Sequence, residues 1–208
     1  MRKLTILLAL SLTPIFAESP ALVVDSAHVA GQEWVVQVFN PASVSATAFL
    51  VGTSEKNFTS MDFLLGARDT HALLPNDTVE VKLQNDGSGE PRILAAIFED
   101  GTTAGDRAWV SHLIFTRRLI ANDLPRAITL ARHAIAQNLE AAVPAQWFRQ
   151  WDERYRETNK GESHPLWLAA EMVFNQAGQQ KADEPARELI QTLEQVQARL
   201  AESKPGLW

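Results

Sequence analysis

The chain has 208 residues, of which 46% are hydrophobic and 21% are charged, and it carries a formal net charge of −6 at pH 7. These proportions are those of a folded globular protein and exclude a disordered chain. The acidic charge, with no compensating basic run, argues against nucleic-acid binding. Cysteine is absent, which excludes disulfides, thiolate metal sites, cysteine nucleophiles and lipid attachment at a cysteine.

The first 17 residues have the pattern of a cleaved signal peptide. Arg2 and Lys3 form a positively charged start, residues 4–12 form a short apolar stretch, and Ala17 offers a small residue for cleavage. A membrane-spanning helix needs about 20 apolar residues, so this stretch is too short for an anchor. Extracellular animal domains of this size usually carry disulfides. We therefore expect a bacterial protein that is periplasmic or secreted, with no membrane insertion after cleavage.

Residues 20–104 have the pattern of short β-strands that end at turn residues. Such strands are expected at residues 33–39, 46–51, 70–74, 78–83 and 92–98. The segment 78–83 alternates most regularly, with Val79 and Val81 on one face and Glu80 and Lys82 on the other. Residues 92–98 are almost continuously apolar, which predicts burial on both faces. Short strands at these intervals predict an antiparallel β-sandwich of immunoglobulin-like type.

The apolar spacing changes to a helical period near residue 105, and residues 105–202 are expected to form four to five α-helices. Asp106 can cap the first helix, because its carboxylate can accept amide hydrogens of the first turn. Pro125 either kinks this helix or divides residues 105–141 into two helices. Pro144 and Pro165 each open a further helix. The last helix is expected at residues 184–202, where one apolar stripe faces a charged remainder.

The two halves together predict the α+β fold class, with an N-terminal immunoglobulin-like β-sandwich and an α-helical C-terminal region packed on it. Asn40, the pair Ala48-Phe49 and the string from Ala96 through Gly101 to Asp106 resemble a group of uncharacterised secreted bacterial proteins. Members of that group have a signal peptide, an immunoglobulin-like sandwich and a helical tail. The resemblance covers roughly residues 20–140. It implies no activity and assigns no functional residues.

Three acids, Glu99, Asp100 and Asp106, lie in a glycine-containing segment between sheet and helix. Several carboxylate oxygens on a flexible loop could bind calcium. The alternating ligands and the terminal glutamate of a helix–loop–helix calcium site are missing. A glycine turn followed by a helix cap is therefore the better interpretation, with the acids near the positive end of the helix dipole. The three acids are kept as possible partner-binding residues.

Trp147, Trp151 and Tyr155 follow one another at intervals of four residues, which places them on one face of a helix. Such a face could hold a sugar or a partner peptide. Aromatic side chains more often pack a helix onto the rest of the fold, and this is the better interpretation. The final helix could pair with a copy of itself, although covering the other helices is favoured and a monomer is expected.

No catalytic, metal or cofactor residue can be assigned from motifs. The five histidines lack metal-binding spacing, although His112 and His133 could approach each other if the helices fold back. The serines form no nucleophile motif.

The leading hypothesis is a non-catalytic binding or structural protein of the cell envelope, with an envelope protein or glycan as partner. One alternative is a hydrolase with a site at the sandwich–helix junction, built from Glu99, Asp100, Asp106 and His112. The other is an envelope assembly or chaperone-like protein with an exposed strand edge.

Overall fold

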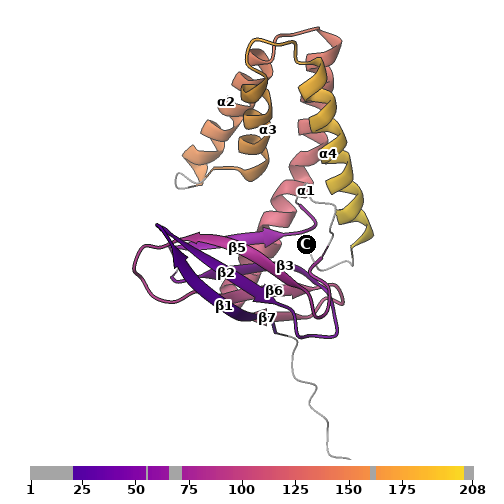
Figure 1. Ribbon diagram of the computed structural model, residues 1–208. Helices are drawn as coiled ribbons and strands as arrows, with labels where there is room; N and C mark the ends of the chain where they lie inside the picture. Colours follow the sequence, from indigo (N-terminus) through magenta and orange to yellow (C-terminus); the bar gives the residue numbers. More distant parts are fainter. Residues whose placement is uncertain (1–20, 55, 66–71, 160–162, 204–208) are drawn as a thin grey trace, which may run out of the picture.

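The structure is a computed structural model that describes residues 21–54, 56–65, 72–159 and 163–203. Its described part contains two antiparallel β-sheets in the first half and four α-helices in the second (Figure 1). The predicted α+β class, with strands before helices, is confirmed. The proposed signal peptide lies outside the described residues.

The strands divide between two sheets that face each other. The first sheet has the order β1 (Val23–Ala30), β2 (Glu33–Phe39), β5 (Thr78–Gln84). The second sheet has the order β4 (Phe58–Asp62), β3 (Ala46–Gly52), β6 (Arg92–Phe98), β7 (Thr103–Gly105). All neighbouring strands are antiparallel.

The core between the sheets is built from strands that the sequence predicted. Val36 and Val81 of the first sheet pack against Phe49 and Phe98 of the second. In β5 the apolar residues point inward and Glu80 and Lys82 are exposed, as the alternation predicted. In β6 the last five residues are buried, because the second sheet has a core on both of its faces.

Several strands differ from the prediction. In the expected strand at residues 70–74, Leu73 forms only an isolated bridge to Ala46, and residues 70 and 71 lie outside the described part of the chain. The expected loop after β6 contains the short strand β7, which pairs with β6. β1 and β4 had no expected boundaries. β1 lies at a sheet edge and is mostly exposed, so it lacks the alternation that marks a half-buried strand.

The helices are α1 (Arg107–Ala136), α2 (Ala142–Thr158), α3 (Pro165–Ala177) and α4 (Asp183–Glu202). α1 is one continuous helix that contains Pro125, so the division into two helices was wrong. It ends earlier than its apolar stripe suggested, because Asn138 has a positive φ of 48° that turns the chain before Leu139. α2 begins two residues before Pro144 and α4 one residue before Glu184.

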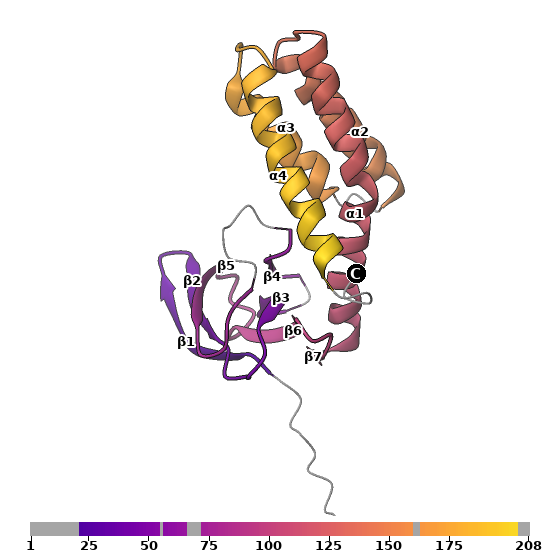
Figure 2. The same cartoon turned by 90° about the vertical axis from the view of Figure 1, so that its right-hand side faces the viewer.

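α1 joins the sandwich to the other helices. Near its start, Val110 and Leu113 cover the outer face of the second sheet, where they meet Leu50 and Ile97. Its second half packs in a separate helical core with the other three helices. Figures 1 and 2 show α1 beside α4 and α2 beside α3, with these helices extending away from the sandwich. None of the helices in the described part is both long enough and apolar enough to cross a membrane.

Gly105 allows the chain to pass directly from sheet to helix. Its φ of 90° is disfavoured for residues with a side chain, and an added Cβ would collide with backbone atoms of Leu94 and Ala95. The next residue, Asp106, caps α1 by accepting a hydrogen bond from the Ala108 amide at 2.7 Å, as predicted. α1 therefore begins directly beside β6.

Candidate functional site

A groove of about 600 Å³ lies where three helices meet the second sheet. α1, α3 and α4 form its walls, and β4 with Leu65 closes it at the sandwich. Most of the lining side chains are aliphatic: Leu65, Leu113, Ile120, Leu124, Leu166, Met172, Val173, Leu189, Leu193 and Val196. Met172 is 51% exposed, so this apolar wall is open to solvent.

Most of the polar lining residues lie towards the two ends of the groove, and Thr192 lies between them on α4, where its hydroxyl donates to the carbonyl of Glu188. Ser60, His112 and Thr116 lie towards the sandwich, while Gln176 and Glu188 lie on the distant parts of α3 and α4. At a rise of 1.5 Å per residue, the stretch of α1 that lines the groove, from residue 112 to 124, is about 18 Å long. The groove is thus elongated and mainly apolar between its ends.

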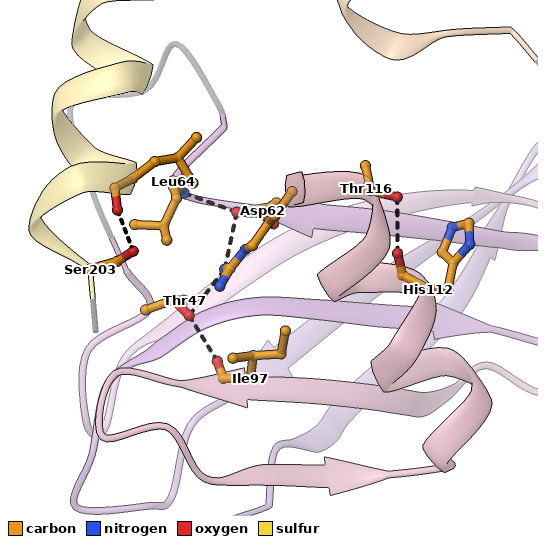
Figure 3. Close-up of polar contacts among 9 residues, drawn as sticks. Thr47, Asp62, Leu64, Ile97, His112, Thr116 and Ser203 are labelled. Carbon is orange, nitrogen blue, oxygen red and sulfur yellow. Dashed lines mark hydrogen bonds and ion pairs between the residues drawn. The ribbon is translucent and has the colours of Figure 1, made fainter. Parts of the chain in front are cut away.

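A buried ion pair stands at the sandwich end of the groove. The guanidinium of Arg117, which is fully buried, donates from Nε to Oδ2 of Asp62 at 2.7 Å and from Nη2 to Oδ1 at 3.1 Å. Nη2 also donates to the Thr47 hydroxyl, which in turn donates to the carbonyl of Ile97. Asp62 accepts a further hydrogen bond from the Leu64 amide (Figure 3). This network ties α1 to β3, β4 and β6.

The charge on Asp62 is balanced inside the fold. Burial raises the pKa of Asp62, whereas the positive charge of Arg117 and its hydrogen bonds act in the opposite direction. Both carboxylate oxygens already accept hydrogen bonds from Arg117. Asp62 is therefore placed to hold the fold together rather than to act as a base on a ligand in the groove.

His112 is the only residue of the sequence-predicted junction set that lines the groove. Its ring contacts the rings of Phe58 and Trp109, each at a centroid distance of 6.0 Å. Among the described residues no hydrogen bond joins it to Ser60 or Asp62, which line the same groove. A nucleophile and base must lie within hydrogen-bond reach of each other, and this arrangement does not place them so.

The three acids of the loop do not meet. Glu99 and Asp100 are exposed in the turn between β6 and β7, where Asp100 accepts hydrogen bonds from the amide and hydroxyl of Thr102. Asp106 is used as the helix cap. Within the described ranges no three His, Asp or Glu side chains are grouped to hold a metal ion. The turn-and-cap interpretation accounts for Asp100 and Asp106.

His112 and His133 do not approach each other. Both lie on α1, 21 residues apart, which corresponds to about 31 Å along the helix axis. The expectation that they could meet required the helix to fold back, and Pro125 does not break it. The ring of His133 instead contacts the ring of Trp147, with centroids 5.7 Å apart and the two planes tilted by 33°.

A second, smaller pocket of about 300 Å³ contains two of the three predicted aromatic residues. It is lined by residues of α1, α2 and α3: Asp123, Arg126, Trp151, Arg154, Tyr155 and Trp167. Trp147 packs elsewhere, against His133. The predicted aromatic face of α2 thus both packs the helix and lines a cavity, since Trp151 also contacts Trp167 at 5.3 Å.

His164 is buried beside this pocket. Its Nε2 lies 3.0 Å from Oδ2 of Asp123, its backbone amide donates to Asp152, and its ring stacks on Trp167 with centroids 4.8 Å apart. Its Nδ1 has no hydrogen-bond partner in the described part of the chain. Burial lowers the pKa of His164 from 6.5, and Asp123 and Asp152 only oppose this effect. His164 is therefore neutral at pH 7.

We expect acid to destabilise the protein through His164. Because its pKa is lowered on folding, the unfolded chain binds the proton more readily than the folded chain. The stabilisation is fully present above pH 6.5 and is lost as the pH falls from there to the lowered pKa, by up to about 1.4 kcal/mol per pH unit. Urea unfolding at pH 7.5 and 5.5 should show a smaller loss of stability for His164→Asn than for the wild type. Equal losses would contradict this assignment.

Comparisons with protein-family models, with curated proteins and with solved structures gave no match. The groove and the smaller pocket are therefore the features of the molecule that bear on its function. Sequence reasoning did not assign the groove, because its α4 residues, such as Leu189 and Leu193, look like an ordinary core stripe. One signal was available: Arg117 lies in the apolar stripe between Leu113 and Ile120, where a charged residue needs a buried partner.

Proposed function

We propose that the protein is an exported, non-catalytic binding protein of the bacterial cell envelope, and that its ligand is a small, elongated and mainly apolar molecule held in the groove. The groove carries this proposal. Its volume of about 600 Å³ falls in the range of about 300–1,000 Å³ that is typical of small-molecule sites. An apolar lining with a few polar groups at its ends is the usual composition of such a site.

An apolar ligand fits this lining better than a glycan does. Sugar recognition relies on many hydrogen-bonding groups, whereas the middle of this groove is formed by aliphatic residues such as Ile120, Leu193 and Val196. Asp62, a carboxylate in the groove, already accepts hydrogen bonds from Arg117 on both oxygens, which supports a non-catalytic role. Export is supported by Arg2, Lys3 and the short apolar stretch after them.

The strand order supports an immunoglobulin-like sandwich as the scaffold. The first, second and fifth strands form one sheet and the other four form the second, so the chain crosses between the sheets after β2, after β4 and after β5. Two antiparallel sheets with such crossings are characteristic of immunoglobulin-like domains. In constant-type domains the fourth strand lies beside the fifth, whereas here β4 pairs with β3.

An assembly or chaperone role through a strand edge has weaker support. β1 is a long edge strand, and Val23 and Val29 are 42% and 47% exposed. Its register shifts between Val24 and Ser26, however, and such a bulge is one of the devices that protect an edge from pairing with another chain.

Binding of dodecanol, a neutral single-chain alcohol, tests the groove. The purified protein should increase the fluorescence of a neutral apolar dye such as N-phenyl-1-naphthylamine. Dodecanol should then reverse this increase by displacing the dye from the groove. Ala169→Phe places a ring in the groove and should weaken dodecanol binding at least about tenfold, about 1.4 kcal/mol. Ala198→Phe is the matched control, because Ala198 is also exposed on a helix but does not line the groove.

Three outcomes would contradict the proposal. The wild type could fail to bind both the dye and dodecanol, or Ala169→Phe and Ala198→Phe could bind dodecanol equally well. Turnover of an ester, glycoside or peptide substrate by the purified protein would overturn the non-catalytic assignment.

A further inference from the structure

The smaller pocket is separate from the groove and has a different chemistry. The two cavities share no lining residue. The smaller one lies between α1, α2 and α3, and its lining is polar and aromatic rather than aliphatic. At about 300 Å³ it is at the lower end of the range for small-molecule sites. A ligand of this pocket must therefore be compact.

Two arginines line this pocket, and in the described part of the chain neither pairs with a carboxylate. Arg126 comes from α1 and Arg154 from α2, and neither forms an ion pair in the described part of the chain. Other arginines of the helices do: Arg132 with Glu194, Arg149 with Glu171 and Arg187 with Asp183. Because a guanidinium presents a planar fork of donors that matches an oxyanion, the pair is arranged to receive one.

Aromatic side chains surround the two guanidiniums. Arg126 lies over the ring of Trp151, a cation–π arrangement that holds the guanidinium against the wall of the pocket. Tyr155 and Trp167 complete the wall. Both are held in place by His164, which contacts the ring of Tyr155 at 4.9 Å and stacks on Trp167. A planar apolar body can therefore lie against rigid rings while its anionic end faces the arginines.

Asp123 limits the charge that the pocket accepts. It lines the same cavity, and the neutral His164 bonded to it at 3.0 Å does not cancel its charge. Two positive charges and one negative charge leave a surplus of one positive charge. This balance favours a monoanion over a dianion such as phosphate.

We propose that this pocket is a second binding site and that it takes a small aromatic monocarboxylate. The carboxylate pairs with Arg126 and Arg154, and the ring lies against Tyr155, because Arg126 already covers a face of Trp151. The site is independent of the ligand in the groove.

Titration with benzoate tests the proposal, with binding followed by calorimetry and by the fluorescence of the tryptophans in the wall. Benzoate should bind to the wild type at least fivefold more tightly than three matched compounds: benzyl alcohol, cyclohexanecarboxylate and inorganic phosphate. Arg126→Gln and Arg154→Gln should each weaken benzoate binding at least tenfold. Arg118→Gln should leave it unchanged, because Arg118 is exposed on α1 and lines neither cavity.

Each of the following results would contradict one claim of the proposal. If benzyl alcohol binds as tightly as benzoate, the pocket does not require an anion. If phosphate or cyclohexanecarboxylate binds as tightly, the pocket does not require an aromatic ring. No benzoate binding, or full binding by both arginine variants, would overturn the site. Arg154→Gln leaves the contact of Arg126 with Trp151 in place, so the test does not depend on one variant. Ala169→Phe should bind benzoate normally, which separates this result from the groove.

Discussion

Replacement of Arg117 by methionine should lower the free energy of unfolding by about 3–5 kcal/mol. The substitution leaves Asp62 buried without its counter-charge, and the loss of one partner of a buried ion pair typically costs this much. It also removes the hydrogen bond that the Thr47 hydroxyl receives from Arg117. Urea unfolding at pH 7, with the midpoint and the slope compared with the wild type, measures the change. Arg118→Met, on the exposed face of the same helix, should change stability by less than about 0.5 kcal/mol.

A double variant and the pH dependence distinguish the unpaired charge of Asp62 from a loss of packing as the cause of the lower stability. Asp62→Leu combined with Arg117→Met replaces both charges by apolar groups and should recover most of the stability, because no buried charge remains. Acid should also reduce the difference in free energy of unfolding between Arg117→Met and the wild type. Burial raises the pKa of Asp62 and Arg117 opposes this rise, so without Arg117 the folded chain takes up the proton at higher pH and gains stability as the pH falls. A double variant as unstable as Arg117→Met would contradict this account.

The ion pair also has a consequence for the groove. Asp62 lines the groove's sandwich end, and Arg117 joins it to α1, which forms one wall. The polar network therefore sets the distance between sheet and helix at the point where the groove closes. In some proteins a buried pair of this kind adds geometric definition even where an apolar pair would be equally stable.

The strands and helices that the sequence could predict are those whose pattern is determined locally. β5 has one face in the core and one in solvent, and α4 has one apolar stripe, so each carries its own period in the sequence. β1 could not be found in this way, since most of its side chains are exposed. β7 is only three residues long and consists of residues that also suit a turn.

The candidate sites depend on tertiary structure that the sequence does not encode locally. Leu189 and Met172 have apolar side chains at helical spacing, and nothing near them in the chain shows that a gap lies between α3 and α4. Of the three aromatic residues spaced along α2, Trp151 and Tyr155 line one cavity, whereas Trp147 packs against His133. Which ring is packed and which lines a cavity depends on the residues that α1 and α3 bring to them, such as His133 and Trp167.

Phe148→Ala should lower the free energy of unfolding by about 3–5 kcal/mol, the usual cost of removing a fully buried aromatic ring. Phe148 belongs to α2, and its ring stacks on Trp167 and Phe174 of α3 at 6.0 and 5.8 Å. Phe49→Ala is the matched control, because Phe49 is equally buried but lies in the core of the sandwich, where it contacts Phe63. Thermal and urea unfolding should show similar losses for the two variants.

The two variants should differ in binding, because α3 forms a wall of both cavities and Phe148 holds it in position. Trp167 lines the smaller pocket, and Leu166 and Val173 line the groove. Under conditions where both variants remain folded, Phe148→Ala should weaken dodecanol and benzoate together, each by at least fivefold. Phe49→Ala should leave both affinities within twofold of the wild type, since the core it disrupts lies between the sheets. Equal effects of the two substitutions on binding would show that the cavities are not supported by the helical core.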